Sequence, residues 1–172
     1  MTETPPVEDL MHPMQFDHHD LSDNRAGKLG MGQIARLKQY QRRNLAIGVT
    51  GFLLLTLTAT TLLYFGSRTA IFTGLGIFAT LLNALLVGMF GRQHIRLQID
   101  IRKGEIEALR GRLERVIKPD RRVGNYMIRV DSAEFYVKKE LFTRFQHDEP
   151  YVLYRAPYSK VLLAAEPASP NS

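Results

Sequence analysis

Two runs of sequence decide the fold of this chain: residues 45–65, LAIGVTGFLLLTLTATTLLYF, and residues 70–90, AIFTGLGIFATLLNALLVGMF. Each run contains 21 residues and no charged side chain. At about 1.5 Å per residue, a helix of this length spans about 30 Å, which is the thickness of the hydrocarbon core of a bilayer. Because neither run offers a polar face to water, the sequence predicts two transmembrane helices, over residues 45–65 and 70–91.

The residues between the two runs, 66–69, are too few for anything but a chain reversal, so they are expected to be the turn of an antiparallel helical hairpin. Basic side chains near the other two ends of the hairpin are Arg36, Lys38, Arg42, Arg43, Arg92 and Arg96. Basic residues close to the ends of a span favour the cytoplasmic side. We therefore expect both termini to be cytoplasmic.

Charged residues are confined almost entirely to the flanks of the hairpin. Arg68 is the only one of the 40 charged residues that lies within residues 45–90, and residues 92–172 carry 16 basic and 11 acidic side chains. A surplus of five is ordinary for a domain beside an anionic leaflet. Lys118, Arg121 and Arg122 form a further basic cluster, for which contact with lipid headgroups is the expected role.

Small residues recur at every fourth position of the second predicted span. They are Gly76, Thr80, Ala84 and Gly88, and Asn83 is the only amide in either span. Such a stripe allows another helix backbone to approach closely. Two interpretations stay open: packing within the hairpin, against Gly48, Thr56 and Thr60, or packing against a second copy or a larger partner.

The segment before the first span is acidic and contains three prolines, so residues 1–30 are predicted to be disordered. His12, His18 and His19 lie near Asp17 and Asp20, and these are residue types that bind metals, but no further motif accompanies them and we expect no metal site. Residues 31–44 place apolar side chains at spacings of three, which predicts an amphipathic juxtamembrane helix.

The stretch that follows the second span, residues 95–117, has an ambiguous periodicity. Leu97, Ile99 and Ile101 alternate with polar residues, whereas positions 106–116 fit a helix equally well. Because a helix would have to accommodate Gly104 and Gly111 at about 1 kcal/mol each, we favour a β-hairpin with a bulge near Gly111 over a helical extension of the second span.

Beyond residue 118 the alternation of apolar and polar residues predicts strands near 126–130 and 135–137. A helical turn or two is expected over 140–146, and residues 151–155 and 160–165 are expected to form a final hairpin. About six short strands in residues 92–167 favour a partly closed barrel of OB-like or SH3-like kind, followed by a disordered tail over 168–172. The expected fold is therefore a membrane α-helical hairpin followed by a small, mainly β, cytoplasmic domain.

Three stretches of the chain resemble a group of uncharacterised bacterial membrane proteins that have two spans and a small C-terminal β domain. They are residues 24–33 (NRAGKLGMGQ), 100–112 (DIRKGEIEALRGR) and 151–167 (YVLYRAPYSKVLLAAEP). The resemblance implies location in the inner membrane of a bacterium, but it implies no activity. In arrangement the chain is similar to membrane-anchored OB-fold proteins of the NfeD type, an analogy of architecture that transfers no residues.

Motifs of catalysis are missing from the sequence, so we expect no enzyme and no cofactor. The chain has no cysteine, no phosphate-binding glycine loop, no Gly-x-Ser-x-Gly and no HExxH. His94 and His147 are the only histidines outside the N-terminal segment, and each is interpreted as a solvated polar residue.

The expected function is that of a membrane-anchored interaction or scaffold module, either an accessory subunit of a larger membrane complex or a homo-oligomer. Its expected partners are the lipid bilayer and itself or another membrane protein. The alternative is a membrane-tethered small barrel that binds a ligand or nucleic acid; five tyrosines and the basic surplus suit the stacking of bases, but we do not expect nucleic acid to be the partner. A channel or transporter is less favoured because the spans hold no charge. The sequence identifies no small-molecule substrate.

Overall fold

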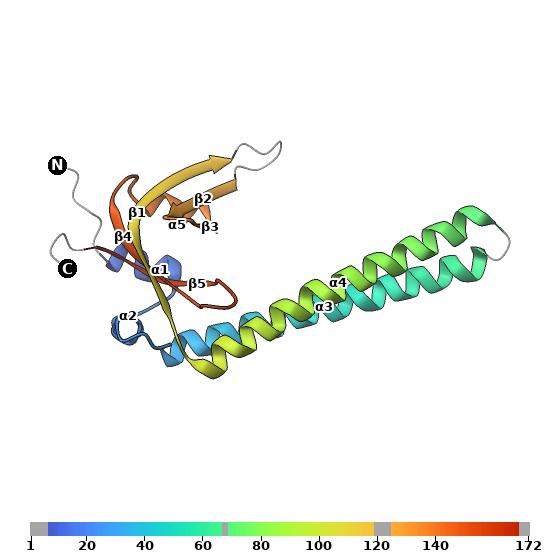
Figure 1. Cartoon of the computed structure of the whole chain (residues 1–172), viewed down its shortest axis with the longest axis horizontal. Helices are drawn as coiled ribbons and strands as arrows, with labels where there is room; N and C mark the ends of the chain where they lie inside the picture. Colours follow the sequence, from blue (N-terminus) through green and yellow to red (C-terminus); the bar gives the residue numbers. More distant parts are fainter. Residues whose placement is uncertain (1–6, 67–68, 119–124, 169–172) are drawn as a thin grey trace. The chain divides into compact units, whose positions relative to one another are not determined.

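A computed structural model describes residues 7–66, 69–118 and 125–168 (Figure 1). The chain divides into two compact units. One consists of Ala35–Arg102, and the other combines Met1–Ile34 with Lys103–Ser172. The second unit is therefore assembled from segments that precede and follow the first unit in the sequence.

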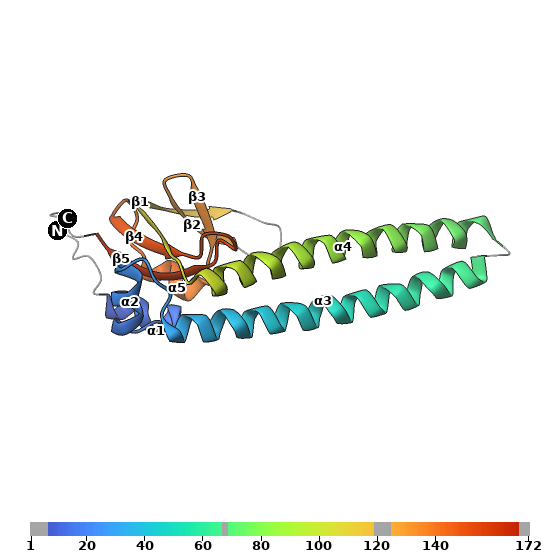
Figure 2. The same ribbon diagram turned by 60° about the horizontal axis from the view of Figure 1, so that its bottom comes forward.

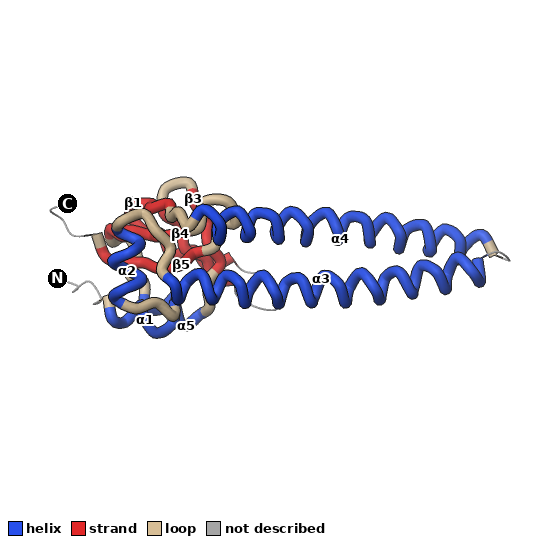
Figure 3. The backbone as a smooth tube through the Cα atoms, turned by 90° about the horizontal axis from the view of Figure 1, so that it is seen from below, coloured by secondary structure: helices blue, strands red, loops and turns tan. Residues whose placement is uncertain are grey.

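The first unit is a pair of long antiparallel helices, α3 (Met31–Gly66) and α4 (Ala70–Lys103), which lie side by side (Figure 3). Both helices are long and apolar enough to cross a membrane. Few of their apolar side chains are covered: only 6% of the most apolar stretch of α3 and 17% of that of α4 is buried. Leu57 and Ile71, for example, are 67% and 71% exposed.

The helices are longer than the predicted spans. Residues 31–44, expected as a separate juxtamembrane helix, form the beginning of α3 without a break. The strand expected over residues 95–101 is wrong, because α4 continues to Lys103. Gly104 lies just beyond that helix with a φ of +63°, the left-handed conformation with which helices commonly end. A glycine counted as a cost inside a helix is thus the residue that terminates it.

The second unit contains a five-stranded antiparallel sheet that curves into a half-barrel (Figures 1 and 2). Its spatial order is β3-β2-β1-β4-β5. The strands are β1 (Glu107–Lys118), β2 (Asn125–Val130), β3 (Ala133–Tyr136), β4 (Pro150–Arg155) and β5 (Leu162–Pro167), and the short helix α5 (Lys139–Arg144) follows β3. The strands after residue 118 and this helix lie where the sequence predicts them. The described residues therefore hold five strands, one fewer than expected, because the first predicted strand is helical.

Strand β1 belongs to both halves of the sheet. Residues 107–112 pair with β4, and residues 113–118 pair with β2. The change of partner comes between Arg112 and Leu113, next to Gly111, where an added Cβ would lie 3.1 Å from Val130 Cγ1. The bulge expected near Gly111 is not what is found, because Gly111 pairs in regular register with Tyr151. The glycine instead allows the neighbouring strand to approach where β1 is shared.

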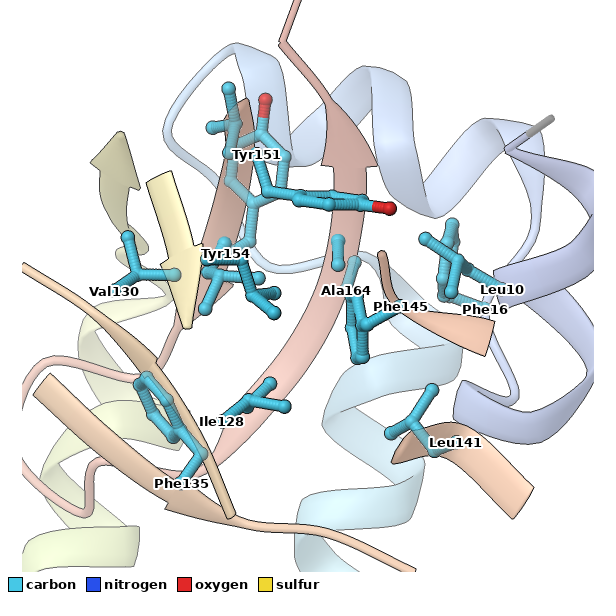
Figure 4. Close-up of a cluster of buried hydrophobic side chains, with 14 of the residues drawn as sticks. Leu10, Phe16, Ile128, Val130, Phe135, Leu141, Phe145, Tyr151, Tyr154 and Ala164 are labelled. Carbon is cyan, nitrogen blue, oxygen red and sulfur yellow. The ribbon is translucent and has the colours of Figure 1, made fainter. Parts of the chain in front are cut away.

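Two helices precede the helical hairpin, α1 (Glu8–Met14) and α2 (His18–Arg25), so the expectation of disorder does not hold for the described part of residues 1–30. Leu10, Phe16 and Leu21 are buried in the same hydrophobic core as Phe145 and Ala164 (Figure 4). Burying a side chain of this size stabilises a fold by about 1.5–3 kcal/mol. The acidic composition of the segment predicted disorder, but these three apolar residues pack in the core of the β domain.

The segment that follows α2 is hydrogen-bonded to the residues that precede β1. Leu29 N–H donates to Gly104 O at 2.9 Å, and Ile106 N–H donates to Gly27 O at 3.1 Å. A Cβ added at Gly30 would lie 2.0 Å from Asp20 Oδ1, so only glycine fits where this segment passes the end of α2. These contacts fix α2 against the sheet and so position the residues described below.

Candidate functional site: a helix seam and a polar pocket

A polar contact joins the two long helices at the middle of their apolar stretches. Asn83 Nδ2 on α4 donates to Thr56 Oγ1 on α3 at 2.8 Å. Asn83 is 8% exposed, and its Oδ1 is buried without a hydrogen-bond partner. Glycines allow close approach on both sides of this contact: a Cβ at Gly76 would lie 2.7 Å from Leu63 Cγ, and one at Gly48 would lie 3.1 Å from the ring of Phe90.

The predicted stripe of small residues divides between two faces of α4. Gly76 is buried together with Asn83, whereas Thr80, Ala84 and Gly88 are exposed. Residues four apart on a helix are offset by about 40°, so a stripe with this spacing rotates away from a seam whose members alternate between spacings of three and four. Packing within the hairpin therefore accounts for the first member of the stripe, and the last two remain uncovered.

On α3, the residues expected to face the stripe divide in the same way. Gly48 contacts Phe90 and Thr56 accepts the bond from Asn83, but Thr60 is exposed and its hydroxyl donates to Thr56 O at 2.8 Å. Thr58, Thr61 and Thr80 likewise donate to the carbonyl four residues before them. These hydroxyl groups are satisfied within their own helices.

The basic residues predicted to lie at a membrane surface are exposed or half-buried on the helices. Lys38, Arg42, Arg43, Arg92 and Arg96 are exposed, and Arg36 is half-buried. The guanidinium of Arg43 lies 5.7 Å from the centre of the Tyr40 ring. Of the other cluster, Lys118 ends β1, and Arg121 and Arg122 lie outside the described residues.

Between α3 and α4 there is an almost wholly apolar pocket of about 450 Å³. It is lined by Phe52, Leu86 and Phe90, among others, and Gly48 and Gly91 leave room for it. His94 borders it with a buried Nδ1 that has no hydrogen-bond partner. His94 is thus at the edge of an apolar space rather than beside a nucleophile or an acid.

A second pocket, of about 440 Å³, lies within the β domain and has a mixed lining. Helix α2 provides Asn24 and Arg25, β1 provides Ala108 and Arg110, and β4 and β5 provide the other side. The lining residues are Asn24, Arg25, Gly27, Ile106, Ala108, Arg110, Val152, Tyr154, Glu166, Pro167 and Ala168. Strand register explains the wall: Arg110 pairs with Val152, and Val152 pairs with Glu166, so these three share one face of the sheet.

Arg25 and Glu166 form an ion pair in the lining of this pocket, and Tyr154 bonds to the same carboxylate. Arg25 Nε lies 3.2 Å from Glu166 Oε1 and 3.1 Å from Oε2, Arg25 Nη2 donates to Oε2, and the Tyr154 hydroxyl donates to Oε1 at 2.6 Å. Burial raises the pKa of Glu166, but the bonds from Arg25 and Tyr154 outweigh burial and the net pKa lies below the usual value. Burial and the Glu166 carboxylate raise the pKa of Tyr154. The Glu166 carboxylate is therefore ionised at neutral pH, and both of its oxygens accept hydrogen bonds.

Two polar groups of the pocket are not used by the ion pair. Asn24 is 2% exposed, and among the described residues neither its Oδ1 nor its Nδ2 has a hydrogen-bond partner. Arg110 is exposed, and among the described residues no acidic group forms an ion pair with it. It still acts on Glu166 through space, because its charge contributes to the lowered pKa of that carboxyl.

The remaining candidates from the sequence have structural roles. Asp17 caps α2 by accepting from Asp20 N–H at 2.7 Å, and His19 lies 3.2 Å from Asp23. Within the described ranges, no three histidine, aspartate or glutamate side chains are grouped closely enough to hold a metal ion. His147 Nδ1 accepts the N–H of Arg115 at 3.0 Å, so it fixes a loop to β1.

The five tyrosines considered for base stacking do not form one surface. Tyr151 and Tyr154 are buried, and Tyr126 packs against Phe142 with ring centres 5.1 Å apart. Tyr136 is 68% exposed, and Tyr158 is bonded by Lys103 Nζ at 2.6 Å. Stacking platforms present several accessible rings along one groove, and most of these rings are used in packing.

No local sequence pattern predicts the pocket, because its members come from four separate elements. One signal was present: the final strand LLAAEP places Glu166 among small apolar residues, and a carboxyl group in such a strand needs a partner. The partner, Arg25, lies 141 positions earlier. No family model, no curated protein and no solved structure matches the chain.

Proposed function

We propose that the chain is an integral membrane protein whose helical hairpin anchors a small cytoplasmic domain and associates with neighbouring transmembrane helices. The observation that carries this proposal is the exposure of the apolar side chains on α3 and α4, of which 6% and 17% are buried in the most apolar stretches. Exposed apolar surface of this extent is stable in lipid or against other apolar helices, and not in water.

Two further observations support the membrane setting. The hydroxyls of Thr58, Thr60 and Thr61 on α3 donate to carbonyls of their own helix, as the lack of water in hydrocarbon requires. Basic residues flank the spans at the ends remote from the turn, which favours cytoplasmic termini. For the β domain, the half-barrel with its shared first strand supports a small barrel of OB-like or SH3-like kind.

The surface through which the hairpin associates is the exposed side of α4 that carries Ala84 and Gly88. Neither is covered within the chain, and nothing lies within 4 Å of a Cβ placed at Gly88. In membranes, small residues at such positions let a second helix approach closely. The partner is a second copy of the chain or a helix of a larger membrane complex.

The association is tested with single-cysteine variants, which the cysteine-free chain permits directly. Ser22→Cys protein is labelled with donor or acceptor dye, and energy transfer is measured in lipid vesicles at several protein-to-lipid ratios. Crosslinking in native membranes detects a different partner. Ala84→Leu with Gly88→Leu should lower energy transfer or crosslinking, and Gly51→Leu, a glycine with equally open space on α3, should not. A chain that is monomeric in vesicles and forms no crosslink in native membranes contradicts the proposal.

Membrane orientation has its own test. A cysteine at Thr69 should react with an impermeant maleimide only from the outside of intact cells, and a cysteine at Ser22 only after the cells are opened. Reaction of the Thr69 cysteine from the cytoplasm alone would reverse the proposed topology.

A further inference from the structure

We propose that the pocket between α2 and strands β1, β4 and β5 binds a small organic monoanion that carries a carboxylate beside an amide. The carboxylate pairs with Arg110, and the amide bonds with the side chain of Asn24. This inference goes beyond anchoring and association, because it assigns a ligand to the β domain itself.

The buried amide of Asn24 is the first observation that points to a ligand. Leaving one buried polar group without a hydrogen bond costs about 1–3 kcal/mol, and here both the donor and the acceptor of one side chain lack a partner. Asn24 lines the pocket at 2% exposure. An amide offers a complementary acceptor and donor pair, so a ligand with an amide satisfies both atoms at once.

The charge of the pocket determines the sign and number of charges on the ligand. Arg25 and Glu166 neutralise each other, which leaves Arg110 as the one cationic group of the lining without an ion pair. One uncompensated positive charge suits one carboxylate. A phosphate monoester with two charges would leave a net negative charge beside Glu166, which costs free energy in a partly buried site. Arginine also binds carboxylates through two parallel hydrogen bonds.

The end of α2 does not oppose an anion at this position. Carbonyl groups at a helix C-terminus carry partial negative charge, but those of Ser22, Asp23 and Asn24 accept the N–H groups of Ala26, Lys28 and Gly27. Distance in the sheet separates the anion from Glu166. Arg110 and Glu166 are two strands apart, which corresponds to about 10 Å between their backbones.

Volume and lining set the size of the ligand. A pocket of about 440 Å³ falls in the range of sites for small molecules. Its other walls are apolar, with Ile106, Val152 and Pro167 among them. An N-acylated amino acid with an apolar side chain combines a carboxylate, an amide and an apolar group in this size.

The test uses the full chain in detergent micelles, titrated with N-acetylleucine in a calorimeter. N-acetylleucine should bind saturably and at least about tenfold more tightly than N-acetylleucinamide, which has the same shape without the charge. An acetylated pentapeptide that ends in leucine separates two sources of the same chemistry. Binding of the peptide assigns the site to the C-terminus of a protein, and binding of N-acetylleucine alone assigns it to a free metabolite.

Variants distinguish the site from nonspecific uptake by the micelle. Arg110→Gln should reduce the affinity for N-acetylleucine to that for its amide, whereas Arg112→Gln, which removes an arginine outside the pocket, should not. Asn24→Leu should weaken binding of both compounds about tenfold without lowering the thermal midpoint, because it replaces an unsatisfied buried amide with an apolar group of similar size. Absence of saturable binding, equal affinities for acid and amide, or an Arg110→Gln protein that binds normally would overturn the proposal.

Discussion

Asn83 Nδ2 on α4 donates a hydrogen bond to Thr56 Oγ1 on α3 at 2.8 Å, so a side-chain contact joins the two helices directly. Both partners lie in the apolar stretches, far from the flanking charges. Hydrogen bonds between membrane helices are worth about 0.6 kcal/mol on average. The contact therefore fixes which faces of the two helices meet more than it stabilises the pair.

A double-mutant cycle with Asn83→Ala and Thr56→Val measures this contact. Each single change should destabilise the helix pair by about 0.5–1 kcal/mol, and their coupling should be about 0.6 kcal/mol. Reversible unfolding in mixed micelles provides the free energies. Strict additivity of the two changes would mean that the bond does not form.

Gly76 and Gly88 should respond in opposite ways to the same substitution. At Gly76 a Cβ would lie 2.7 Å from Leu63, so Gly76→Leu should destabilise the helix pair by about 1–3 kcal/mol. At Gly88 the space is open, so Gly88→Leu should leave the unfolding free energy within about 0.5 kcal/mol of the parent. The same micelle unfolding assay compares them, and equal effects would show that the seam lies elsewhere.

Leu10→Ala tests the place of α1 in the core of the β domain. Leu10 is fully buried, and truncation of a buried leucine to alanine costs about 2–5 kcal/mol. His12→Ala, on the exposed side of the same helix, is the control and should have little effect. The measurement is the thermal midpoint followed by near-ultraviolet circular dichroism of the tyrosines. A Leu10→Ala protein as stable as the control would mean that α1 does not pack in the core.

Acid should weaken the contact between Glu107 and the strand beside it. Hydrogen bonds from Arg155 at 2.9 Å and Lys160 at 3.1 Å lower the pKa of Glu107 from 4.5 to about 2. Because the folded-state pKa is the lower one, this stabilisation is present above about pH 4.5 and is lost as the pH falls toward 2.

The expected magnitude of this pH effect is below about 1 kcal/mol, since the Glu107 side chain is 37% exposed and solvent screens the pair. Glu107→Gln should be less stable than the parent at pH 6, and the difference should shrink toward pH 3. Circular dichroism melts at both pH values provide the comparison. A constant difference would assign the effect to the size or hydrogen bonding of the side chain and not to its charge.

The sequence predicted best where one solvent or one period dominates. Two uncharged runs of 21 residues have no alternative to long apolar helices, and strict alternation located strand β2. It failed where the deciding partner is distant. The alternation at Leu97, Ile99 and Ile101 predicted a strand, but α4 continues through these residues and ends where Gly104 adopts a left-handed conformation.

The candidate sites were predictable to different degrees for a similar reason. Gly76 and Asn83 were predicted to lie in a helix interface, because residues that share one face of a helix are close in sequence. The pocket was not, because Asn24, Arg110 and Glu166 are brought together by strand order and by α2, which no local pattern encodes. Disorder was predicted for α1 and α2 because composition averages over the few apolar residues that reach the core.

The β domain is completed from both ends of the chain, with the helix pair inserted between its parts. During synthesis α1 and α2 emerge first, yet the strands that cover Leu10 and Phe16 are the last to be made. The apolar side chains of α1 and α2 therefore stay uncovered while α3 and α4 are synthesised. Ribosome-bound chains that stop before β5 should be sensitive to protease in this early segment, and full-length chains should be resistant.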